Sequence, residues 1–108
     1  MGRLTTHVLD TTSGKPAAGV AVRLYRGGLL IASAVTNDDG RCDAPLLEGH
    51  SLVSGVYDLV FAIGDYFALP APRFLDEVVL RFTVGDATQH YHVPLIATPW
   101  SYTTYRGS

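Results

Sequence analysis

Apolar and polar residues alternate with a period of two along most of this chain, and no other feature of the sequence restricts the fold as strongly. In the first such run, residues 4–10, every second side chain is directed to the same face, which is typical of a half-buried β-strand. Turn-forming Gly, Pro, Asn and Asp residues separate this run from the next. Further strands are predicted over residues 20–26, 29–36, 56–63, 77–84, 89–96 and 100–105.

Seven or eight short strands with short connections predict an all-β sandwich, because a strand with one apolar face must bury it against a second sheet. Residues 13–16 are expected to turn and residues 45–49 to form a loop. At most one short helix is expected, over residues 66–69, because the prolines that follow end it. The predicted core side chains of two strands are Tyr57, Leu59, Phe61, Ile63, Val78, Leu80, Phe82 and Val84.

Length and composition predict one domain over residues 1–108, since 47% of the residues are hydrophobic and 17% are charged. The net charge is −2 and the Lys and Arg residues are scattered, so nucleic acid is not an expected partner. No secretory signal and no run of 18 apolar residues is present, so we expect no membrane association. The lone cysteine, Cys42, suits a reducing compartment, which predicts the cytoplasm.

Three histidines on predicted strands are candidates for proton transfer. His7 lies in the first strand, and His90 and His92 lie two residues apart, on one face of theirs. Histidine titrates near neutral pH, so an imidazole that faces a cleft can accept or give a proton with little change in its pKa. Any one strand histidine is nevertheless more often a structural hydrogen-bonding residue. His50, in a loop, is interpreted in that way.

An arginine after a dense turn and the polar end of the chain are further candidates. Arg41 follows Asn37–Gly40, and its permanent charge suits an anionic ring or a developing oxyanion, although most arginines only face solvent. The closing residues 105–108 are ambiguous by themselves, because chain ends are usually polar and frayed.

The three strand histidines also allow a zinc site as an alternative, since His-x-His with a third histidine is a plausible ligand set for a catalytic ion. No carboxylate or cysteine stands beside the pair at ligand spacing, so we expect no metal. A serine nucleophile in a G-x-S-x-G turn and a glycine-rich phosphate loop are both absent from the sequence.

Three stretches together resemble the 5-hydroxyisourate hydrolases, the enzymatic branch of the transthyretin family. The first is Thr6-His7-Val8-Leu9-Asp10 with Gly14-Lys15-Pro16-Ala17, and the second is Thr36 to Arg41. The third runs from His90-Tyr91-His92-Val93-Pro94-Leu95 to Tyr105-Arg106-Gly107-Ser108, and its final tetrapeptide is the most specific motif. The resemblance spans essentially the whole chain and implies a transthyretin-like sandwich.

The resemblance also implies an activity and a set of site residues. The implied reaction is hydrolysis of 5-hydroxyisourate in urate breakdown, without a cofactor, by a cytoplasmic homotetramer with active sites at a subunit interface. A non-enzymatic transthyretin-like protein that binds a small ligand is the alternative. The implied catalytic residues are His7, Arg41 and His92, and the implied substrate-binding residues are Tyr105, Arg106, Gly107, Ser108 and, with less support, His90.

Overall fold

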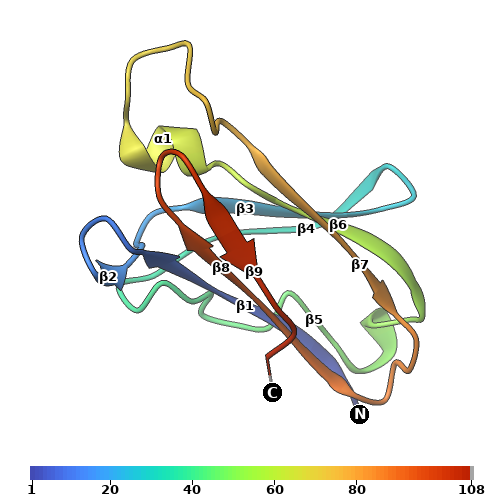
Figure 1. The fold of residues 1–108 in the computed structure, drawn as a ribbon. Helices are drawn as coiled ribbons and strands as arrows, with labels where there is room; N and C mark the ends of the chain where they lie inside the picture. The colour runs from blue at the N-terminus through green and yellow to red at the C-terminus, as the bar shows by residue number, and fades with distance from the viewer. Residues whose placement is uncertain (108) are drawn as a thin grey trace.

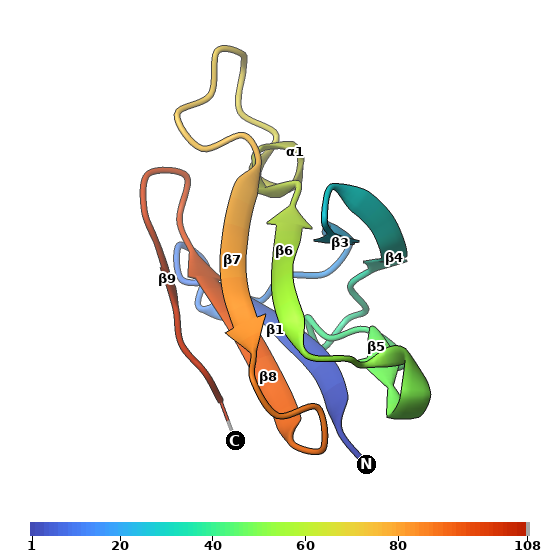
Figure 2. The ribbon, with the colours of Figure 1, turned by 90° about the vertical axis from the view of Figure 1, so that its right-hand side faces the viewer.

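Two β-sheets face each other in the computed structural model, which describes residues 1–107 (Figures 1 and 2). One sheet has the order β2 (Lys15–Pro16), β1 (Arg3–Asp10), β8 (His90–Ala97) and β9 (Tyr102–Thr104), and β5 (Leu47–Glu48) also pairs with β1. The other has the order β4 (Leu29–Val35), β3 (Ala21–Arg26), β6 (Gly55–Phe61) and β7 (Val78–Val84). The predicted all-β sandwich is therefore confirmed.

The structure differs from the predicted elements mainly in short segments. The two-residue strands β2 and β5 lie where a turn and a loop were expected. Two residues are too few to produce an alternating pattern, and both strands form only because β1 offers backbone partners. A one-turn 3₁₀ helix, η1 (Gly49–Ser51), follows β5.

The short helix α1 (Ile63–Phe67) begins three residues before the predicted start. Ile63 and Gly64 are buried, so tertiary packing rather than local sequence decides where the helix begins. Gly64 allows a close approach here, because a Cβ at this position would lie 2.6 Å from the Asp76 Oδ1 atom. Ala68 ends the helix in the left-handed conformation, with φ of 54°.

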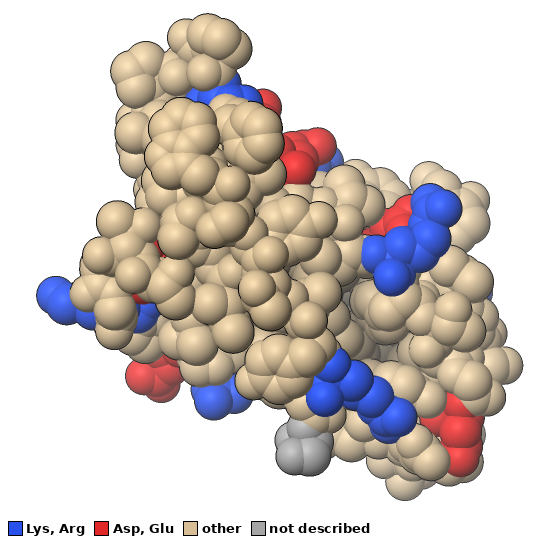
Figure 3. Space-filling view, in the orientation of Figure 1, with Lys and Arg blue, Asp and Glu red and all other residues tan. Residues whose placement is uncertain are grey.

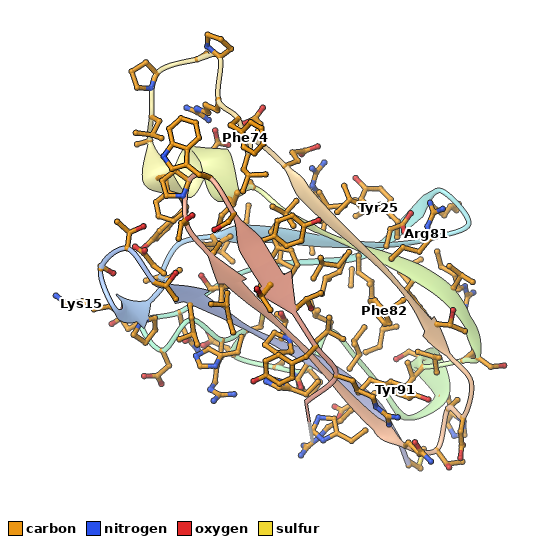
Figure 4. The ribbon with its side chains drawn as sticks, viewed as in Figure 1. Lys15, Tyr25, Phe74, Arg81, Phe82 and Tyr91 are labelled. Carbon is orange, nitrogen blue, oxygen red and sulfur yellow. The ribbon has the colours of Figure 1, made fainter. Side chains whose placement is uncertain are left out.

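The core lies between the inward faces of the two sheets. The predicted core faces of β6 and β7 are confirmed, except that Phe82 is only partly buried and stacks on Tyr57 at a ring-centroid distance of 5.8 Å. Phe82 and Tyr91 lie in the space between β7 and β8 (Figure 4). The Tyr57 hydroxyl donates a hydrogen bond to the Val53 carbonyl at 2.6 Å, which satisfies the polar group of a buried ring.

The pairing of β1 with β8 positions the candidate site. The two strands run parallel although they are far apart in the sequence, with Thr5 opposite His92 and Arg3 opposite His90. Alternation buries every second residue of each strand in the core and leaves the others on the outer face of the sheet. The half-buried outer-face residues include Thr5, His7, His90 and His92.

Three arginines of the surface form ion pairs: Arg23 with Glu77, Arg73 with Asp65 and Asp76, and Arg81 with Asp58. Figure 3 shows Lys and Arg side chains at separate places on one face, with uncharged surface between them. Within residues 1–107, no helix has the length and apolar character needed to cross a bilayer.

Candidate active site

A cavity of about 590 Å³ opens on the outer face of β1 and β8. Its wall combines four parts of the chain: β1, the segment after the Asn37–Gly40 turn, β8 and the segment after β9. The residues that line it are Arg3, Thr5, Thr6 and His7, residues 41–45, His90 and His92, and Tyr105 and Gly107. Of the residues implied by the resemblance, the structure brings His7, Arg41, His92, His90, Tyr105 and Gly107 to this one cavity.

The Asn37–Gly40 turn places Arg41 beside His7. The Asn37 Oδ1 atom accepts a hydrogen bond from the Arg41 backbone N–H at 3.2 Å, which closes the turn. Gly40 has φ of 73°, and a Cβ there would lie 2.3 Å from the Val8 carbonyl oxygen, so only glycine fits. The Gly40 carbonyl accepts from the Val8 N–H at 2.7 Å, and Arg41 then forms an isolated antiparallel bridge with His7.

The Thr5 hydroxyl links the two histidines of β8. It lies 2.8 Å from the Nδ1 atom of His92 and 3.1 Å from the Nε2 atom of His90. The sequence reasoning did not identify Thr5 as a site residue. Its place on the same strand face as His7 was visible in the alternation, but the parallel register that sets it opposite His92 was not.

The segment after β9 returns to β8 and packs against His92. The Gly107 backbone N–H donates a hydrogen bond to the His92 carbonyl at 2.7 Å. A Cβ on Gly107 would lie 2.7 Å from Cδ2 of the His92 ring, so the absence of a side chain permits this contact. Tyr105 also lines the cavity, whereas Ser108 lies outside the described residues.

Arg106 does not line this cavity. Its guanidinium carbon lies 4.2 Å from the Tyr91 ring centroid, and its Nη2 donates to Gln89 Oε1 at 2.8 Å and to the His90 carbonyl at 3.3 Å. Arg106 lines a second cavity of about 480 Å³ between β7 and β8 instead of the first. In this position Arg106 anchors the segment that carries Gly107.

The pKa values of His7 and His92, the outer-face histidines next to Arg41, are lowered, which favours their neutral form. Burial lowers the pKa of His92, and the positive charge of Arg41 and the neighbouring His7 and His90 lower it further. Burial and Arg41 also lower the pKa of His7, against a smaller opposing effect of Asp39. A neutral imidazole has a free ring nitrogen that can accept a proton.

The same cavity contains the lone cysteine, but as an inert thiol. Burial, and after it the charge of Asp43, raises the pKa of Cys42, so the thiol stays protonated. Within the part of the chain that the structure describes, no three His, Cys, Asp or Glu side chains gather in an arrangement that could hold a metal ion. His90 and His92 each direct a nitrogen at the Thr5 hydroxyl.

This arrangement can support hydrolysis through a transition state that develops an oxyanion. Two neutral imidazoles can take and return protons, and a fixed guanidinium beside them can stabilise an oxyanion. His7, Arg41 and His92 therefore bring groups for proton transfer and for oxyanion stabilisation to one cavity.

Comparison with known proteins finds similar sequences. The sequence model of the HIUase/Transthyretin family matches residues 4–107. A 5-hydroxyisourate hydrolase of Ralstonia nicotianae is 56% identical, with all of each chain covered.

Two solved structures are also similar. The Klebsiella pneumoniae 5-hydroxyisourate hydrolase superimposes with a TM-score of 0.88 at 37% identity, with all of both chains covered. An (S)-allantoin synthase superimposes with a TM-score of 0.94 at 43% identity, with 99% of this chain and 44% of that longer chain covered.

Proposed function

The chain belongs to the HIUase/Transthyretin family, and on that premise we propose that it is an enzyme that hydrolyses 5-hydroxyisourate in urate breakdown. The observation that carries the proposal is the convergence of His7, Arg41 and His92 on one cavity. The relatives named as hydrolases of this substrate match over the full length of the chain.

In the proposed reaction, water attacks the carbonyl carbon of the amide in the six-membered ring. One of the two neutral histidines, His92 or His7, removes the proton from the water as the new C–O bond forms. The lowered pKa of each histidine favours the unprotonated form that this step requires. General base help of this kind contributes about 10²–10⁴-fold to the rate.

Collapse of the tetrahedral intermediate breaks the C–N bond and opens the ring. Arg41 stabilises the negative charge on the intermediate's oxygen, and its position beside His7 is fixed by the turn before it. The second histidine protonates the leaving nitrogen, which becomes part of a ureido group, while the carbonyl becomes a carboxylate. The product is 2-oxo-4-hydroxy-4-carboxy-5-ureidoimidazoline.

We assign substrate binding to the C-terminal segment and to His90. Tyr105 and Gly107 line the cavity and would contact the bound ring, and Arg106 holds this segment on Tyr91. Ser108, which lies outside the described residues, would complete the binding segment. His90 contacts Thr5 and would act through that contact.

We further propose a cytoplasmic homotetramer with the active site at a subunit interface. The cavity is open on the outer face of its sheet, so a second subunit could close it. The neighbouring strand β9 is exposed along its whole length, which leaves surface for such a contact. Light scattering during gel filtration would measure the mass, and a monomer at assay concentration would refute this part of the proposal.

The experiment that tests the activity follows the absorbance of 5-hydroxyisourate, generated from urate with urate oxidase. We expect decay well above the spontaneous rate with the native protein and near-background decay with His92→Ala. His50→Ala is the matched control, because His50 is an exposed histidine of η1 outside the cavity. It should retain native activity.

Two other results would redirect the assignment. Background decay with the native protein would favour the non-enzymatic alternative, a transthyretin-like protein that binds a small ligand. Loss of activity on treatment with a chelator, restored by zinc, would favour a metal-dependent hydrolase, whereas the proposed mechanism predicts no effect of the chelator.

A further inference from the structure

The hydroxyl of Thr5 stands between two imidazoles in a way that the mechanism above does not use. Thr5 lies on β1 directly opposite His92 of β8, and its Oγ1 atom is 2.8 Å from His92 Nδ1 and 3.1 Å from His90 Nε2. Both distances are those of hydrogen bonds. All three side chains are half-buried in the cavity wall, where a lost hydrogen bond is not fully replaced by water.

The proton count of this chain of groups allows only two arrangements for neutral histidines. A hydroxyl has one proton, so Thr5 donates to one imidazole nitrogen and accepts from the other. If Thr5 donates to His90 Nε2, it accepts from His92 Nδ1–H, and the Nε2 atom of His92 is left without a proton. If Thr5 donates to His92 Nδ1, the proton of His92 is on Nε2 and the proton on His90 Nε2 points to Thr5.

Only the first arrangement leaves the Nε2 atom of His92 without a proton and able to act as a base. The tautomer of a histidine is set by the hydrogen bond that its other nitrogen makes. Here that bond is made to a hydroxyl whose own direction is set by His90. A proton on His90 Nε2, whether from tautomerism or from ionisation of His90, therefore places a proton on the Nε2 atom of His92.

We propose that Thr5 is a positioning residue for His92, and that its hydroxyl ties the tautomer of His92 to the protonation of His90 Nε2. Its neighbour Thr6 has a different task, because its hydroxyl donates to the Val93 carbonyl at 2.7 Å and joins β1 to β8. The effect of Thr5 on the rate depends on the proposed hydrolase function, but its effect on the tautomer does not.

Charged groups around the relay formed by His90, Thr5 and His92 come from several elements. Arg41 and His7 lie close enough to His92 to lower its pKa, and Arg3 lies opposite His90 in the strand register. Asp43 and Tyr105 line the same cavity. Arg41, His7 and His90 make it harder for His92 to become charged, but the hydrogen bond between Thr5 and His92 selects which nitrogen of neutral His92 keeps the proton.

The test is a nitrogen-15 NMR measurement of the histidine tautomers in the full-length protein, at a pH where both histidines are neutral. In the native protein we expect the proton of His92 on Nδ1 and that of His90 away from Nε2. In Thr5→Val, which keeps the shape without the hydroxyl, we expect the His92 population to move toward a proton on Nε2. Thr5→Ser, which keeps the hydroxyl, should restore the native tautomer.

The kinetic measurement uses the same proteins. We expect kcat/KM to fall about tenfold in Thr5→Val, the equivalent of roughly 1.4 kcal/mol, and to recover to within about threefold of native in Thr5→Ser. Thr83→Val is the matched control, since Thr83 lies exposed on β7 and outside this cavity. It should leave both the tautomer and kcat/KM unchanged.

Several outcomes would overturn the inference. An unchanged His92 tautomer in folded Thr5→Val, or native kcat/KM despite a changed tautomer, would each do so. If Thr5→Val does not fold, the native protein still decides: neutral His90 and His92 that both carry, or both lack, a proton on the nitrogen facing Thr5 would refute the relay. An inactive native protein with the expected tautomers would refute the proposed function and leave the relay standing.

Discussion

Replacing Gly107 by alanine tests whether the C-terminal segment must contact His92 for the enzyme to work. The new Cβ would lie 2.7 Å from Cδ2 and 3.3 Å from both Cβ and Cγ of His92. Non-bonded carbon atoms prefer a separation of about 3.5–4.0 Å, so at least one of these contacts is a severe overlap. The segment or the imidazole must therefore move.

The size of the effect follows from what holds the segment in place. Overpacking by one methyl group costs about 1–3 kcal/mol. The Gly107–His92 backbone hydrogen bond, at 2.7 Å, contributes only about 0.5–1.5 kcal/mol, so the overlap is expected to displace the segment. If the cost falls on the transition state, kcat/KM falls by about 5- to 150-fold.

The assay is the decay of 5-hydroxyisourate at substrate concentrations that give kcat/KM, with circular dichroism to confirm the sandwich. Gly85→Ala is the matched control, because a Cβ at Gly85 meets no atom within 4 Å. We expect native kinetics from that variant. Native kcat/KM in folded Gly107→Ala would show that the contact of this segment with His92 is not needed for catalysis.

Two further perturbations follow from the charges and hydrogen bonds of the structure. Removing the cation in Arg41→Gln should raise the pKa of His7 and His92, so the acid limb of the pH profile of kcat/KM moves to higher pH while the rate falls. Arg26→Gln, at an exposed arginine of β3, should leave the acid limb in place. An unmoved acid limb in Arg41→Gln would contradict the assigned charge effect. The Tyr66 hydroxyl donates a hydrogen bond to the buried Asp10 carboxylate at 2.8 Å. Tyr66→Phe should therefore lower the free energy of unfolding, measured by denaturant titration at pH 7, by about 1–3 kcal/mol. Tyr102→Phe, at an exposed tyrosine, is the control and should change it little. Burial raises the pKa of Asp10, but the hydrogen bonds from Tyr66 and the following turn outweigh burial and lower that pKa. The stabilisation should therefore disappear as the pH falls through the lowered pKa. An equal loss of stability in both tyrosine variants would count against the role of the hydrogen bond.

The strands that build the core could be predicted because their pattern is local. The buried side chains of β7 and all of those of β6 except Val60 follow directly from alternation, since a strand places every second residue on one face whatever its partner is. The helix start and the strands β2 and β5 could not be predicted in the same way. Their positions depend on contacts with Asp76 and β1, which lie elsewhere in the chain.

The candidate site shows the same division. The resemblance of the motifs predicted His7, Arg41 and His92 as site residues, and the structure places all three on one cavity. Imidazole and guanidinium groups suit proton transfer and charge stabilisation, but residue chemistry alone left each of the three ambiguous. Alternation also placed His90 and His92 on one face. Neither observation gave the distance between any two of these side chains.

The sequence by itself determined the residue types, the alternating strands and the turn that precedes Arg41, because each depends on neighbouring residues alone. Only the tertiary structure decided that β1 lies parallel to β8, since strand pairing over such a separation depends on the whole sandwich. That register sets the Thr5 hydroxyl between two imidazoles, and the return of the chain along β8 after β9 brings Gly107 onto His92 and Arg106 onto Tyr91. The chemistry was present in the residues, and the packing of the two sheets gave it its geometry.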